Sequence, residues 1–87
     1  MTTNEILKKQ ILYRSTHRGT KEMDFILGNF VNRYIHTFSS IELGQLDNFL
    51  KYDDDSILNL YHEKKMIEKI PENNVTKLFI KFSTSKL

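Results

Sequence analysis

The stretch that decides the fold is TKEMDFILGNFVNRYIHTF, residues 20–38. Its apolar side chains recur at steps of three and four residues, which places them on one face of a helix. They are Met23, Ile26, Leu27, Phe30, Val31, Tyr34, Ile35 and Phe38. Gly28 lies inside this pattern at some cost in helix propensity, and we expect it to permit close packing of a neighbouring segment. The stretch is therefore predicted to form the central helix of the domain.

Helices are also predicted on both sides of this stretch. Asn4 is expected to cap a first helix that ends near residues 15–17. After the central helix, Ser39 and Glu42 have the spacing of a capping box, which predicts the start of a third helix. The apolar faces of these two helices are expected to be Ile6, Leu7, Ile11 and Leu12, and Leu43, Leu46, Phe49 and Leu50.

Two shorter helices are predicted in the C-terminal third. Asp53 and its two following aspartates place carboxylates at the start of a fourth helix, where they complement the positive end of the helix dipole. Pro71 suits the first turn of a fifth helix. The chain has one proline and three glycines, which favours helices over a turn-rich β protein. We therefore expect an all-α fold, a compact single-domain bundle of about five helices over residues 1–87, with frayed ends near residues 1–3 and 83–87.

Composition excludes several classes of protein. The 87 residues leave room for one core, and with no cysteine there are no disulfides or thiolate metal sites. Three scattered histidines do not have the spacing of metal ligands, so no metal is expected. No apolar run is long enough for direct membrane insertion. The N-terminus lacks the apolar region of a signal peptide, so we expect a cytoplasmic (bacterial) protein and favour the mitochondrial matrix less.

Charge is distributed unevenly, although the net charge is only +2. Residues 8–21 contain five cations and no acid, whereas residues 42–55 contain five acids and one lysine. Such a dipolar surface is more typical of a protein that steers a protein partner than of one that coats DNA. Ordinary solvated helix faces are the alternative interpretation.

The segment RSTHRGTKEMD, residues 14–24, lies between the first two predicted helices, and we call it the corner segment. In a purely structural interpretation, Gly19 either closes the first helix or starts the central one. If it is the N-cap of the central helix, Glu22 is at the third helical position, from which its carboxylate can reach back to the backbone. This interpretation leaves the concentration of cations unexplained. Arg18, beside a glycine, is expected to present its planar guanidinium to a carboxylate or phosphate of a partner.

Two blocks of this sequence carry a resemblance to a known family. LYRSTHRGTKEMD, residues 12–24, resembles the signature of the succinate dehydrogenase FAD assembly factor family, whose Arg-Gly-x-x-Glu hallmark falls on Arg18, Gly19 and Glu22. LKYDDDSILNLY, residues 50–61, is similar to the family's Leu-x-x-Asp-Asp stretch. The likeness covers roughly residues 6–62. It departs from the family pattern at Thr16 and His17, where a basic residue is common, and at Ser56 and Leu60, where an acid and a tryptophan are common.

The resemblance implies a function. Members of the family are assembly factors rather than enzymes, and they promote covalent attachment of FAD to the flavoprotein subunit of succinate dehydrogenase by positioning. FAD is then a cofactor of the partner and is not bound stably by this chain. Fumarate reductase is a second partner that the resemblance allows. The partner-binding residues that the resemblance implies are Tyr13, Arg14, Ser15, His17, Arg18, Gly19, Glu22 and Asp24.

Individual roles follow from the same resemblance. Arg18 is expected to contact an anionic group of the partner or its flavin, and Gly19 to let the backbone approach closely. Glu22 is expected to pair with a partner cation or to order the corner through the helix cap. Asp53 and Asp54 are interpreted as helix caps in preference to interface residues.

Two other classes of function remain as alternatives. One is a generic helical protein-interaction module with unrelated partners. The other is a small helix-turn-helix-like nucleic-acid binder that uses the basic corner segment. We expect no nucleic acid, because no helix combines a basic face with side chains suited to base edges, and the acidic residues 42–55 repel phosphate.

Overall fold

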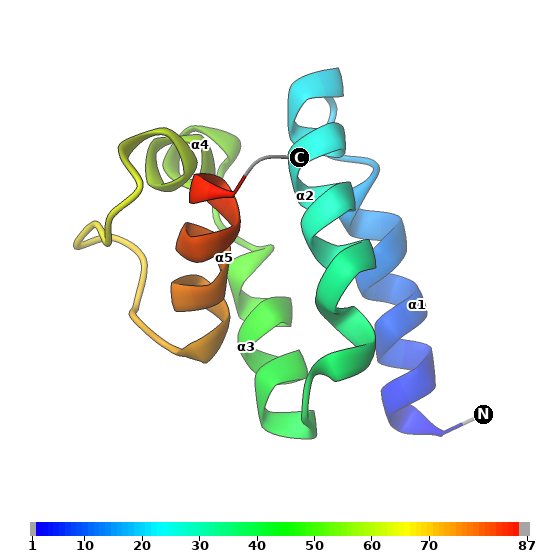
Figure 1. The fold of residues 1–87 in the computed structure, drawn as a ribbon. Coiled ribbons are helices and arrows are strands. Elements are labelled where there is room, and N and C mark those ends of the chain that lie inside the picture. The colour runs from blue at the N-terminus through cyan, green and yellow to red at the C-terminus, as the bar shows by residue number, and fades with distance from the viewer. Residues whose placement is uncertain (1, 86–87) are drawn as a thin grey trace.

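Five α-helices and one short 3-10 turn make up the regular structure of residues 2–85, the part of the chain that this computed structural model describes. The elements are α1 (Thr3–Ser15), α2 (Lys21–Tyr34), η1 (Ile35–Thr37), α3 (Ser40–Phe49), α4 (Asp54–Glu63) and α5 (Asn74–Thr84). No strand occurs within residues 2–85. The predicted all-α bundle of about five helices is confirmed (Figure 1).

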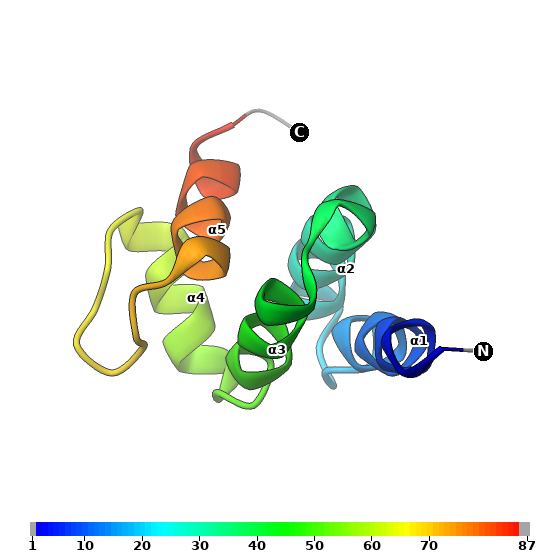
Figure 2. The ribbon, with the colours of Figure 1, turned by 90° about the horizontal axis from the view of Figure 1, so that it is seen from below.

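The helices form two groups that meet at α3. The first group consists of α1 and α2, which run antiparallel side by side, and α1 also contacts α3. On the other side of α3 lie α4 and α5, which contact one another (Figure 2). This order brings the α1–α2 connection and the α3–α4 turn to the same end of the bundle (Figure 1).

The core is built around α2, as the periodic pattern predicted. Met23, Ile26, Leu27, Phe30 and Val31 of this helix are buried, and the ring of Phe30 contacts several other aromatic rings. The Phe30 ring centroid is 5.0 Å from that of Phe79 and 5.4 Å from that of Phe82, both on α5. Phe49 of α3 lies 5.0 Å from Phe79. These edge and tilted ring contacts join α5 to α2 and α3, which are distant from it in sequence.

One predicted helix start is confirmed and one is wrong. Ser39 and Glu42 form the expected capping box: the Ser39 hydroxyl accepts from the Glu42 N–H at 3.2 Å, and the Glu42 carboxylate accepts from the Ser39 N–H at 2.9 Å. At α1, however, Thr2 is the N-cap and accepts from the Glu5 N–H, where Asn4 was expected. The Asn4 amide instead donates to the Ser40 hydroxyl at 2.8 Å, because α1 and α3 lie in contact.

The start of the fifth helix was also predicted wrongly. Pro71 precedes α5 and is not part of its first turn. Asn73 is the N-cap, and its side chain and that of Thr76 each accept a backbone N–H of the other residue at 2.9 Å. This reciprocal pair satisfies the backbone N–H groups of Asn73 and Thr76, which a proline at the first helical position would not satisfy. The capping box therefore determines where α5 begins.

Gly28 has the packing role that its place in the pattern predicted. It is buried on α2, and a Cβ built at Gly28 lies 3.1 Å from the Thr16 side chain at the end of α1. The α2 helix therefore approaches the corner segment closely at Thr16. The ends were predicted to fray. In the structure Thr2 caps α1 and Thr3 begins it, and α5 includes Ser83 and Thr84. Residues 1, 86 and 87 lie outside the described part of the chain.

Candidate functional site

The corner segment connects α1 to α2 by a tight turn. Gly19 has φ +105°, a backbone conformation that side chains with a Cβ rarely adopt. Of the two alternatives for Gly19, the start of the central helix is not observed: Thr20 is the N-cap of α2, and its hydroxyl accepts from the Met23 N–H at 3.3 Å. Glu22 is consequently the second helical residue and has no capping bond. The threonine hydroxyl supplies the acceptor that glycine lacks, which explains the shift by one residue.

Asp24 closes the turn from the α2 side. One of its carboxylate oxygens accepts from the Arg18 N–H at 2.6 Å. The Asp24 N–H donates to the Thr20 carbonyl at 3.0 Å in the first turn of the helix. Asp24 is half-buried, so its role in this structure is to fix the backbone between the two helices.

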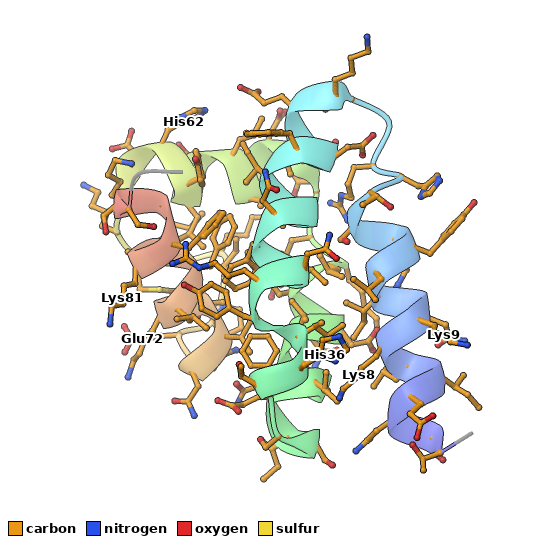
Figure 3. The ribbon with its side chains drawn as sticks, turned by 45° about the vertical axis from the view of Figure 1, so that its right-hand side comes forward. Lys8, Lys9, His36, His62, Glu72 and Lys81 are labelled. Carbon is orange, nitrogen blue, oxygen red and sulfur yellow. The ribbon has the colours of Figure 1, made fainter. Side chains whose placement is uncertain are left out.

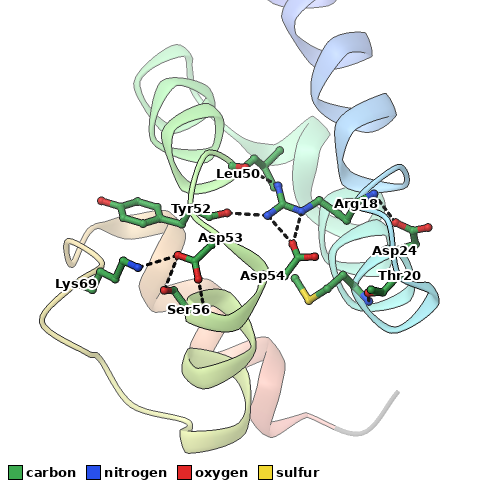
Figure 4. Close-up of polar contacts among 10 residues, drawn as sticks. Arg18, Thr20, Asp24, Leu50, Tyr52, Asp53, Asp54, Ser56 and Lys69 are labelled. Carbon is green, nitrogen blue, oxygen red and sulfur yellow. Dashed lines mark hydrogen bonds and ion pairs between the residues drawn. The ribbon is translucent and has the colours of Figure 1, made fainter.

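The Arg18 side chain leaves the turn on the opposite side and reaches the α3–α4 turn (Figure 4). Its Nε donates to an Asp54 carboxylate oxygen at 3.0 Å, and Nη2 lies 2.8 Å from the same oxygen. Nη1 donates to the Leu50 carbonyl at 2.5 Å, and Nη2 to the Tyr52 carbonyl at 2.7 Å. The side chain is 13% exposed. The expectation of an unshielded guanidinium is therefore wrong, because the α3–α4 turn folds over it.

Asp53, beside Asp54, is the N-cap of α4, as the cap interpretation predicted. It accepts from the Ser56 N–H at 3.2 Å and from the Ser56 hydroxyl at 2.8 Å. The Lys69 ammonium lies 2.8 Å from the same carboxylate. The bond from Lys69, and after it those from Ser56, hold the pKa of the Asp53 carboxyl well below its usual range.

Two of the predicted site residues have structural partners on α1 and α3. The Arg14 guanidinium forms an ion pair and hydrogen bond with Asp47. Ser15 is fully buried, and its hydroxyl donates to the Leu12 carbonyl at 2.8 Å. A partner-binding role for the Ser15 side chain therefore needs correction, since it does not reach the surface.

The two charged blocks of the sequence are in contact. Arg14 pairs with Asp47, and Arg18 pairs with Asp54, so cations of residues 8–21 meet acids of residues 42–55. The sequence contained this signal, because the two blocks have opposite charge and comparable length. Their mutual pairing removes much of the positive field that the corner segment was expected to offer to a phosphate.

Aromatic side chains are exposed on both sides of the turn. Tyr13 is 64% exposed, and its ring stacks on that of His17 with centroids 3.9 Å apart and an angle of 12° between the planes. His17 Nδ1 lies 2.7 Å from the Tyr13 carbonyl, which fixes the orientation of the imidazole. On α2, Phe25 is 60% exposed. Sequence analysis missed Phe25. The signal was available, because this aromatic residue, three positions after Glu22, does not fit the spacing of the buried apolar face of its helix.

Glu22 differs from Asp24, the other acid of the corner segment. It is exposed on the first turn of α2, and its carboxylate, like the Lys21 ammonium, forms no hydrogen bond or ion pair with any other residue of the described range 2–85. The histidines are spread out: His36 and His62 lie on distant parts of the molecule (Figure 3). Over residues 2–85, no three histidine, aspartate or glutamate side chains form a group that could hold a metal ion.

A hollow of about 590 Å³ lies between α1 and α3, beside the corner segment. It is lined by Leu7, Lys9, Gln10, Tyr13, Arg14 and Asp47. These residues belong to the sides of the two helices. None of the helices within residues 2–85 is long and apolar enough to cross a membrane.

Fold and site together define a small all-α protein with one internally braced, exposed corner. Comparison with known proteins identifies its family. The chain belongs to the family described as "Flavinator of succinate dehydrogenase", whose model matches residues 9–83. The resemblance predicted from the two sequence blocks is thus confirmed, and the family is one of succinate dehydrogenase assembly factors.

Curated relatives agree with this assignment. "Succinate dehydrogenase assembly factor 2, mitochondrial" of Dictyostelium discoideum is 34% identical over 74 residues, which cover 85% of this chain and 52% of the relative. "FAD assembly factor SdhE" of Acetobacter pasteurianus is 32% identical over 50 residues, or 58% of this chain and 46% of the relative. The chain thus spans about half the length of these relatives. No solved structure matches it at comparable significance.

Proposed function

We propose that this chain binds the flavoprotein subunit of succinate dehydrogenase and promotes covalent attachment of FAD to it by positioning, without catalysing the reaction itself. The names of the family and of its relatives support this proposal, since they describe assembly of that enzyme and of its FAD. The proposed compartment is the bacterial cytoplasm, with the mitochondrial matrix as the alternative.

The observation that carries the proposal is the surface at the corner segment. Apart from Gly19 and its two chain neighbours, no heavy atom lies within 4 Å of the position where a Cβ of Gly19 would be, so the backbone there is open to close approach. Glu22, one helical turn away, has no partner within residues 2–85 and is available to a cation of the flavoprotein. Tyr13 and Phe25 add exposed aromatic area on either side. Aromatic side chains of this kind are common anchors of protein interfaces.

Positioning is the mechanism that this surface supports best. The flavin and the side chain to which it becomes attached are proposed to lie in the partner. Two groups held in a reactive arrangement react faster because the loss of orientational freedom has already occurred. A rigid corner that binds the flavoprotein in one conformation supplies that restriction. Arg18 and Asp24 support this role by bracing the corner from inside.

The proposal is tested with purified components. The apo flavoprotein subunit is incubated with FAD, with and without this chain, and covalent flavin is measured by fluorescence of the denatured subunit on a gel. We expect a stable complex on size-exclusion chromatography and a faster gain of covalent flavin that saturates near equimolar chain. Glu22→Gln should weaken both. No complex, or no change in the rate of attachment, refutes the proposal.

A further inference from the structure

Arg18 belongs to the sequence hallmark of the corner segment, but its donors are used within the chain. A guanidinium has five N–H donors in a planar fork. Nε and both Nη atoms donate to the Leu50 and Tyr52 carbonyls of the α3–α4 turn and to Asp54, the first residue of α4. Both edges of this guanidinium that could bind a carboxylate or phosphate of a partner in a bidentate manner are therefore already occupied.

These contacts connect two segments that are distant in sequence. Arg18 and Asp54 are 36 residues apart, and each lies in one of the two blocks that carry the family resemblance. The α1–α2 connection and the α3–α4 turn lie at the same end of the bundle (Figure 1). The corner is thus attached at two points: Asp24 holds the Arg18 N–H, and Asp54 with two carbonyls holds the Arg18 side chain (Figure 4).

We propose that Asp54 is a positioning residue, which holds Arg18 so that Gly19 and Glu22 are presented to the flavoprotein in a fixed orientation. Arg18 then promotes binding through Asp54 and does not itself contact the partner. This inference rests on the proposed function. Releasing the brace leaves the corner in the binding conformation for only part of the time, and the apparent affinity falls by that fraction.

Asp53 provides a matched control. It is the neighbouring carboxylate and pairs with Lys69 on the side away from Arg18 (Figure 4). Asp53→Asn removes the same charge as Asp54→Asn and keeps a good N-cap residue. The two substitutions should therefore differ in their effect on the corner while having similar effects on net charge and on α4.

The test is a double-mutant cycle on affinity for the apo flavoprotein subunit, with wild type, Arg18→Met, Asp54→Asn and the double variant, all measured where circular dichroism shows them folded. Asp54→Asn should weaken binding about tenfold in the wild-type background and have no further effect in the Arg18→Met background. Asp53→Asn should leave affinity within about twofold. If Arg18→Met does not fold, Arg18→Lys replaces it, because it retains the charge but not the fork.

A second measurement separates positioning from loss of overall stability. ¹⁵N relaxation of the free chain should show lower order at the Gly19 and Thr20 amides in Asp54→Asn, and no change there in Asp53→Asn. Equal effects of Asp54→Asn in both backgrounds, or none in the wild type, overturn the inference while leaving the proposed function intact. Absence of binding by the wild-type chain overturns both. Unchanged order at Gly19 in Asp54→Asn also overturns the inference.

Discussion

Replacement of Gly19 by alanine isolates the backbone requirement of the corner. Gly19 has φ +105°, and no atom lies within 4 Å of an added Cβ, so the substitution introduces strain without a steric clash inside the chain. A residue held in such a conformation costs about 1–3 kcal/mol. With a cost of about 2 kcal/mol, the Tm of a domain of this size should fall by roughly 8–16 °C.

Gly44→Ala is the matched control for this prediction. Gly44 also has no atom within 4 Å of an added Cβ, but it lies within α3. Alanine is favoured over glycine in a helix by about 0.8–1 kcal/mol, so this variant should be more stable and its Tm higher by a few degrees. The same substitution, glycine to alanine, is thus expected to lower the free energy of unfolding at Gly19 and to raise it at Gly44.

The assay is thermal and urea unfolding followed by circular dichroism at 222 nm. A total stability of roughly 4–13 kcal/mol is usual for 87 residues, so Gly19→Ala should remain folded at 25 °C. If Gly19→Ala is as stable as wild type while Gly44→Ala is stabilised, the argument from positive φ at the corner is refuted.

Three further predictions concern the core, the acid response and the α1–α2 contact. Phe30→Ala removes the central ring of the aromatic group and should lower the free energy of unfolding by about 3–5 kcal/mol, measured by urea titration. The pKa of the Asp53 carboxyl is lowered in the folded state, so its ionised form contributes to folding stability above the ordinary carboxyl pKa, and this contribution is lost as pH falls through the lowered value. In Asp53→Asn the free energy of unfolding should therefore fall less steeply below about pH 4 than in wild type. Gly28→Ala brings a methyl group to 3.1 Å from the Thr16 side chain, so it should gain less stability than Gly44→Ala, or lose some, in the same unfolding assay.

The sequence was sufficient for features that depend on nearby residues. The spacing of Met23, Leu27 and Phe30 predicted the central helix because one face of a helix repeats every three to four residues. Ser39 and Glu42 predicted a helix start because both partners of the capping box lie within one turn. Such features need no knowledge of the tertiary structure.

Competing local signals explain the boundaries that were wrong. Thr20 provides a side-chain acceptor that Gly19 lacks, and Asn73 with Thr76 satisfies two backbone donors that Pro71 does not. In both places the residue chosen from the sequence fitted the geometry, but a neighbour offered an additional hydrogen bond. Counting the backbone donors satisfied by each candidate cap would have favoured the observed starts.

The exposure of the site residues depended on contacts that are distant in sequence. Arg18 is covered by the α3–α4 turn, whose Leu50 and Tyr52 carbonyls lie more than 30 residues away along the chain. No local pattern predicts that a backbone carbonyl will accept from a particular arginine. The sequence did contain one signal, the opposite charges of residues 8–21 and residues 42–55. These charges indicate that the two segments attract one another, but they do not specify that Arg18 pairs with Asp54.

The most direct test of the central claim is made in cells. Covalent flavin of the succinate dehydrogenase flavoprotein subunit is measured by in-gel fluorescence after denaturation, in cells lacking this chain and in cells that express wild type or Glu22→Ala. Glu22 is exposed and has no partner within residues 2–85, so its removal should change stability by less than about 0.5 kcal/mol. We expect fluorescence to be lost without the chain, restored by wild type and restored only weakly by Glu22→Ala at equal protein level. Equal fluorescence in all of these cells would contradict the account.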